Sequence, residues 1–156
     1  MPFTLIHGLL SYFLVCFFTK DKRLRFLGFA AGTLPDLDGI PILFDMELFY
    51  AIHHELFHPP IYGIILAIPV ALVLGHFFKM DKVKTFAVFA ASFILHPLTD
   101  VLFTNWPVKL LWPFSEEQFL YPIFIEYNAH LAAIVMLLLF VQLIKFNSEK
   151  TRQPTK

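Results

Sequence analysis

Residues 85–103 read TFAVFAASFILHPLTDVLF, and this stretch decides the class of fold. A helix needs about 20 apolar residues to cross the hydrocarbon core of a bilayer, and the stretch has that length. It contains no Lys, Arg or Glu, and its ionisable side chains are His96 and Asp100. The stretch therefore predicts a membrane-spanning helix that carries two ionisable groups within it.

The composition of the whole chain agrees with a membrane location. Hydrophobic residues make up 58% and charged residues 15% of the 156 residues, against roughly 45–50% and about 25% in soluble domains. A net charge of +0 gives no electrostatic footprint for nucleic acid. The single cysteine, Cys16, excludes an intramolecular disulfide and a cysteine-type zinc site.

Five apolar stretches together predict an all-α, polytopic transmembrane helix bundle. Several are short or contain proline, so we expect some spans to be tilted or broken. We expect residues 1–146 to form a single transmembrane domain and residues 147–156 a polar cytoplasmic tail. The expected spans are residues 3–18, 26–44, 61–78, 85–103 and 119–144.

Basic residues predict the orientation of these spans. Clusters of Lys and Arg at residues 20–25, 79–84 and 145–156 follow the first, third and fifth spans. Alternating spans place the three clusters on one side, and the positive-inside rule makes that side cytoplasmic. We therefore expect a multi-pass protein of the inner (plasma) membrane, with its N-terminus outside and its C-terminus in the cytoplasm.

The pair His96 and Asp100 is the strongest local signal for chemistry. Residues four apart share a helix face, so the imidazole and the carboxylate point the same way and can bind one metal ion or bridge to a second. Ionisable residues inside a membrane are costly and usually functional. The alternative is a histidine that only forms a hydrogen bond to a neighbouring side chain.

A second polar segment reads Leu34-Pro-Asp-Leu-Asp-Gly39. Pro35 disfavours an α-helical conformation at the preceding residue, so we expect the helix to break here. Asp36 and Asp38 would then turn into a polar cavity, where a bound cation removes their mutual repulsion. The alternative is a simple turn in which an aspartate caps the backbone.

The segment His53-His-Glu-Leu-Phe-His-Pro59 is rich in potential metal ligands. Neutral imidazole is the commonest metal ligand in proteins, which makes His53 and His58 candidates, with His54 as a further one. The spacing is not that of the HExxH zinc proteases. An interfacial loop with no metal is the alternative reading.

Three further residues lie at the expected outer side. His7 stands alone on an apolar stretch, where a packing role is the more common one, but its outer position makes it a candidate ligand. Glu126 and His130 form another pair spaced by four residues, and we keep them as additional ligands or supporting groups.

Taken in order, these segments resemble the YdjM-type membrane-bound metal-dependent hydrolases, a family that includes a LexA-regulated inner-membrane protein. The resemblance covers roughly residues 4–115. It departs from the family where His54-Glu55 replaces Arg-Gly, which predicts a different substrate or a lost phosphate contact. The matching positions are His7, Gly32–Asp38, His53 with His58, His96 with Asp100, and Trp112-Pro113-Phe114.

The resemblance and the ligand types together predict a metal-dependent hydrolase with zinc, or else manganese or iron, in a site for two ions. Glu55 is the expected general acid or base, and Asp38 or Asp100 is expected to bridge the ions. A phosphoester, such as a lipid headgroup, is the expected substrate. The expected ligands are His7, Asp36, Asp38, His53, His58, His96 and Asp100.

Two other classes of function remain open at this point. Intramembrane His and Asp also mark ion pathways, so the chain could transport or handle metal ions. It could also be a structural membrane protein in which a metal ion holds short helices together. The oligomeric state is not predicted by the sequence.

Overall fold

A computed structural model describes residues 4–54 and 57–152, with side chains up to residue 145. All regular elements of this part are helical, which confirms the predicted all-α class. The elements are α1 (Thr4–Phe18), α2 (Lys22–Thr33), η1 (Leu34–Leu43), α3 (Met46–Ile52), α4 (Pro60–Phe77), α5 (Lys82–Phe103), η2 (Ile125–Tyr127) and α6 (Asn128–Arg152).

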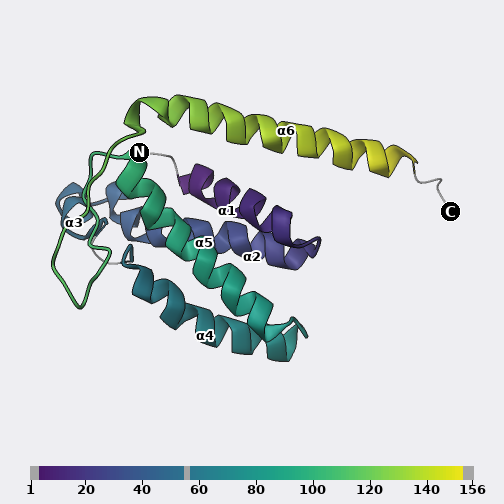
Figure 1. Ribbon diagram of the computed structural model, residues 1–156, viewed down its shortest axis with the longest axis horizontal. Helices are drawn as coiled ribbons and strands as arrows, with labels where there is room; N and C mark the ends of the chain where they lie inside the picture. Colours follow the sequence, from purple (N-terminus) through teal and green to yellow (C-terminus); the bar gives the residue numbers. More distant parts are fainter. Residues whose placement is uncertain (1–3, 55–56, 153–156) are drawn as a thin grey trace.

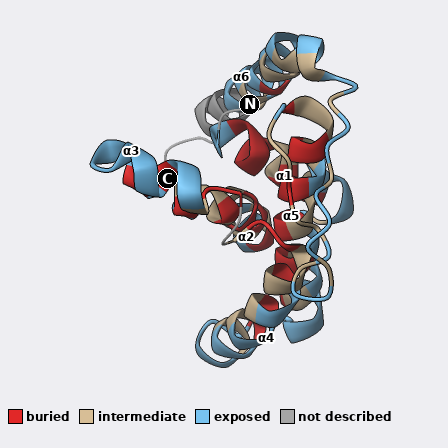
Figure 2. Cartoon of the chain, turned by 90° about the vertical axis from the view of Figure 1, so that its left-hand side faces the viewer, coloured by how far each residue is buried: buried red, intermediate tan, exposed pale blue. Residues whose placement is uncertain are grey.

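Helix α5 lies at the centre of the bundle and packs against α2 and α4, while α1 packs against α2 (Figure 1). Helix α6 lies along the outer side of α1 (Figure 1). Half of the apolar window of α5 is buried, against 17% for α4 and 6% for the span that ends at Lys145. Figure 2 shows the same division between a buried centre and outward-facing apolar helices, which suits contact with lipid.

Three helical stretches are long and apolar enough to cross a membrane: Pro60–Phe77, Lys82–Phe103 and Ile125–Lys145. Helix α1 is apolar but shorter. The expected fifth span starts later than predicted, because residues 119–124 form backbone hydrogen bonds to Val101 and Leu102 at the end of α5 and to Val108 in the connection that follows it. At its other end α6 continues to Arg152, into the segment expected to be a tail.

The expected second span, residues 26–44, is two elements instead of one. Helix α2 begins earlier, at Lys22, and η1 follows it directly as a 3-10 helix with Pro35 in its first turn. Leu34 keeps right-handed helical angles, so the proline changes the type of helix without forcing an extended residue. The 3-10 helix carries both Asp36 and Asp38, less than one turn apart, at the end of the bundle.

Small residues allow the helices that carry the site to approach closely. A Cβ atom on Gly32 would lie 2.9 Å from the carbonyl oxygen of His7, so α1 and α2 could not pack this way with a larger residue. A Cβ atom on Gly63 would lie 2.8 Å from the ring of Phe93, which fixes the approach of α4 to α5.

The fold gathers basic residues at one end of the bundle, where α1 and α6 end and α2 begins (Figure 1). The guanidinium of Arg23 donates a hydrogen bond of 3.1 Å to the carbonyl oxygen of Phe78, which joins the first connection to the one between α4 and α5. Lys22, Arg25 and Lys145 line one pocket at this end. The opposite end carries η1, α3 and the end of α5.

Candidate metal centre

Histidine and aspartate side chains from four parts of the chain meet at the end opposite the basic residues. They come from α1, from η1, from the loop that follows α3, and from the last turns of α5. Every buried ionisable side chain in the described residues belongs to this cluster. Burial of so many ionisable groups in one place requires that they compensate one another or hold a cation.

His96 and Asp100 lie one helical turn apart on α5, as their spacing predicted, with 3.2 Å between Nε2 and Oδ2. The other ring nitrogen, Nδ1, lies 2.7 Å from the carbonyl oxygen of Gly32. A carbonyl oxygen can only accept, so Nδ1 carries the hydrogen atom. In the neutral ring, Nε2 then presents a lone pair to Asp100 and to Asp36, whose Oδ1 is 3.3 Å away.

His58 is held in the same way. Its Nδ1 lies 3.1 Å from Oδ2 of Asp38, a carboxylate that can only accept, so this nitrogen is the donor. Nε2 of His58 is then left 3.5 Å from Oδ2 of Asp100 and 3.8 Å from Oδ1 of Asp36. The second histidine therefore also directs a lone pair at the two aspartates.

His7 adds a third imidazole from α1. Its Nδ1 lies 2.8 Å from Oγ1 of Thr99, and that hydroxyl donates its own hydrogen to the carbonyl oxygen of His96. The hydroxyl must therefore accept from His7, which leaves Nε2 of His7 facing Oδ1 of Asp100 at 3.2 Å. The rings of His7 and His96 stack with their centroids 3.9 Å apart.

With neutral rings, these contacts bring acceptors together with no donor between them. Nε2 of His58, Nε2 of His96 and both carboxylate oxygens of Asp100 are buried and have no hydrogen-bond partner. Lone pairs at such distances repel unless a cation or a shared proton lies among them. Three sets of potential ligand atoms lie within 4.8 Å of one another: His7, His96 and Asp100; Asp36, His58 and His96; and His54, His58 and Asp100.

The donor set fits a transition metal. Imidazole nitrogens combined with carboxylate oxygens suit zinc, manganese or iron. His58, His96 and Asp100 each belong to two of the three sets, so two ions could share them. Asp36 lies at the edge of the cluster. Its side chain is 9% exposed, whereas the side chains of His7, His58, His96 and Asp100 are at most 1% exposed.

His54 takes a strained position in this centre. Its φ angle of 69° lies in the left-handed region, which few non-glycine residues adopt and where backbone strain can be stored. Its ring is buried with neither nitrogen hydrogen-bonded, and Trp106 covers it at 5.1 Å between ring centroids. Burial, followed by the neighbouring His58, lowers the pKa of His54 to about 3, so the ring is a neutral ligand at pH 7.

Two of the predicted ligands, Asp38 and His53, lie next to the candidate metal-binding groups and not among them. Both oxygens of Asp38 are occupied, one by His53 at 2.7 Å and the other by His58 and by the backbone N–H of Phe57. His53 in turn contacts Asp38 and is absent from the three ligand sets. The contacts of this pair are those of groups that orient a ligand.

Glu126 and His130 are not brought to the centre. Both are exposed, and the ring of His130 lies beside Tyr127. Glu55, the expected general acid or base, lies outside the described residues. Thr99 and the carbonyl group of Gly32 were not among the predicted site groups, although Thr99 stands inside the His-x-x-x-Asp stretch, where a hydroxyl can reach the preceding turn.

Comparison with known proteins identifies the family. The family model described as YdjM inner membrane protein matches residues 1–154. The chain therefore belongs to the YdjM inner membrane protein family, which confirms the resemblance and the membrane location. No curated protein and no solved structure matches the chain.

Proposed function

We propose that this member of the YdjM inner membrane protein family is a membrane-embedded metal-dependent hydrolase that acts on a phosphoester, such as a lipid headgroup, at the outer leaflet. One observation carries the proposal. In their neutral form, the Nε2 atoms of His7, His58 and His96 converge on carboxylate oxygens with no donor between them. Such an arrangement suits divalent cations better than it suits the metal-free protein.

His7, His58, His96, Asp36 and Asp100 would hold the ions, with His54 as an additional ligand. Asp100 offers its two oxygens to different histidines, so it is the carboxylate that would be shared by two ions. A divalent cation at this place supplies Lewis acidity, which stabilises negative charge on a phosphoryl group and makes water a better nucleophile.

Groups around the ligands fix their orientation. The Gly32 carbonyl, the Asp38 carboxylate and the Thr99 hydroxyl each accept from Nδ1 of one histidine and so select the tautomer with a free Nε2. Such partners of ligand histidines commonly change metal affinity by about 10–100-fold when they are removed. We assign these three groups a positioning role.

Location and surroundings support a substrate at the membrane surface. A cavity of about 540 Å³ lies beside the centre and is lined in part by Tyr50 and Trp106. Trp106 also covers His53 and His54, so it separates this cavity from the buried ligands. Tyr and Trp favour the headgroup level of a bilayer, which is where a phosphoester headgroup would be met.

A structural metal site is the second candidate, and one observation favours it. The ligands are almost wholly buried and come from α1, η1, the loop after α3 and α5, so an ion would connect four segments. Such an ion can stabilise a fold without any turnover. Transport has less support, because no buried ionisable side chain of the described residues lies toward the basic end.

The test combines metal content with turnover. The detergent-purified protein, reconstituted with zinc or manganese, is assayed by elemental analysis and with bis-p-nitrophenyl phosphate, p-nitrophenyl phosphate and phosphatidylglycerol as substrates. The variants are His96→Ala and Asp36→Ala, and the matched control is His130→Ala, an exposed histidine outside the cluster.

We expect about two metal equivalents, hydrolysis of at least one substrate, and loss of both in His96→Ala but not in His130→Ala. Metal binding that raises thermal stability without hydrolysis of any phosphoester would favour the structural role. A wild-type protein without stoichiometric metal would overturn both candidates.

A further inference from the structure

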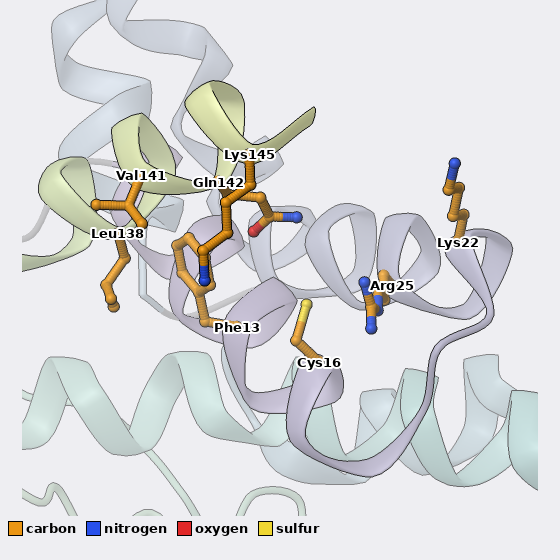
Figure 3. Close-up of a pocket in the computed structure, with 8 residues that line it drawn as sticks. All are labelled: Phe13, Cys16, Lys22, Arg25, Leu138, Val141, Gln142 and Lys145. Atoms are coloured by element: carbon orange, nitrogen blue, oxygen red, sulfur yellow. The ribbon is translucent and has the colours of Figure 1, made fainter. Parts of the chain in front are cut away.

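A cavity of about 410 Å³ lies at the basic end of the bundle, far from the histidines and aspartates, between α1, the start of α2 and α6 (Figure 3). It forms where α6 and α1 separate. Near the other end the two helices are joined by an apolar cluster that includes Ile6, Leu9 and Val135. Toward the basic end the space between them is hollow.

Three cationic side chains line this cavity, and none of the carboxylates among the described side chains does. Lys22 and Arg25 project from the first turns of α2, and Lys145 extends from α6 toward α1 (Figure 3). The Nε of Arg25 donates a hydrogen bond of 2.9 Å to the carbonyl oxygen of Thr19, which holds the guanidinium in place. The charge of the cavity therefore complements an anion, and an ordered guanidinium is well suited to phosphate.

Apart from Gln142, the rest of the wall is largely apolar and follows the helices into the membrane-facing part of the bundle. Phe13 of α1 and Leu138 and Val141 of α6 line this part (Figure 3). Gln142 donates a hydrogen bond to the hydroxyl of Tyr12, so α6 and α1 also contact each other beside the cavity. A soluble anion would use only the basic rim, whereas a phospholipid would fill the apolar wall as well.

We propose that this cavity binds one anionic phospholipid, with its headgroup at Arg25 and Lys145 and an acyl chain against Phe13, Leu138 and Val141. Basic pockets between transmembrane helices on the cytoplasmic side are sites of this type in general. The lipid fills the space between α6 and the rest of the bundle and so fastens a helix that has few buried residues. This inference is independent of the metal centre and of any hydrolytic activity.

Native mass spectrometry of the full-length protein in mild detergent tests the proposal. Phosphatidylglycerol is titrated into the wild type and into Lys145→Gln, with phosphatidylcholine and inorganic phosphate as separate probes. Lys84→Gln is the matched control, because Lys84 lies at the same basic end but lines a different groove, between α1 and α5. Val141→Trp fills the apolar wall without changing the charge.

We expect one retained phosphatidylglycerol, with affinity reduced about fivefold in Lys145→Gln, reduced in Val141→Trp, restored in Lys145→Arg, and unchanged in Lys84→Gln. Equal losses in Lys145→Gln and Lys84→Gln would mean that only general surface charge attracts the lipid, and the proposal would fail. Phosphatidylcholine retained as well as phosphatidylglycerol, or inorganic phosphate that displaces the lipid, would also overturn it.

Discussion

The two ends of this bundle differ in whether their ionisable side chains are buried or exposed. At one end, histidines and aspartates are buried within contact distance of one another, and the side chains of Asp38, His58 and His96 are inaccessible. At the other end, Lys and Arg are mostly exposed, as in the ion pair of Arg23 with Asp21, whose side chains are 57% and 34% accessible. Buried charges must be matched by particular partners, whereas exposed ones are stabilised by water and screened by salt.

Specificity in this small membrane protein therefore resides at the buried end. At the buried end three histidines have a fixed orientation, since the Nδ1 atoms of His7, His58 and His96 each have an acceptor. At the basic end the exact position of a Lys or Arg side chain matters less for stability than its positive charge. We therefore expect substitutions to have large, site-specific effects at the buried end and small, additive effects at the basic end.

The largest effect is expected for Asp100→Asn. The change removes the negative charge of the Asp100 carboxylate, whose two oxygens face the Nε2 atoms of three histidines. Breaking a buried ionic network costs about 3–5 kcal/mol. We expect the metal content to fall below one equivalent and the thermal midpoint of the metal-loaded protein to drop markedly, as measured by elemental analysis and thermal unfolding in detergent.

Glu126→Gln is the control for that experiment, because Glu126 is an exposed carboxylate outside the cluster. The same loss of metal in both variants would show that general charge, and not the buried centre, retains the ion.

An intermediate effect is expected for Thr99→Val. The change keeps the shape of the side chain but removes the acceptor that orients His7, so we expect metal affinity to fall about 10–100-fold while the fold persists. Competition with a chelator of known affinity measures the change, and Thr99→Ser should restore most of it. Unchanged affinity in Thr99→Val would remove His7 from the proposed ligand set.

The smallest effect is expected for Arg23→Gln at the basic end. The exposed pair with Asp21 contributes little to stability, and the hydrogen bond to Phe78 is also exposed. Asp21 has its pKa lowered by the side-chain hydrogen bond from Arg23, so we expect this pKa to return toward its usual value in the variant. Thermal unfolding and metal content should both stay close to those of the wild type, and a large loss of either would contradict the contrast between the two ends.

Equal spacing in the sequence led to different outcomes in two places. His96 and Asp100 are four residues apart on one continuous helix and meet as predicted. Glu126 and His130 have the same spacing, but η2 covers Ile125–Tyr127 and α6 begins only at Asn128, so the pair spans a change of helix type at an exposed turn. Spacing predicts a shared face only where the helix is regular across the pair.

The sequence alone determined the membrane environment, the helical class, the family and the identity of most residues in the buried cluster. These follow from composition and from local order along the chain, which need no knowledge of packing. Only the tertiary structure decided that Asp36 faces the centre while Asp38 supports His58, and that Gly32 and Thr99 select the tautomers. Those roles depend on contacts between residues far apart in the sequence, and such contacts exist only when α1, η1 and α5 pack together.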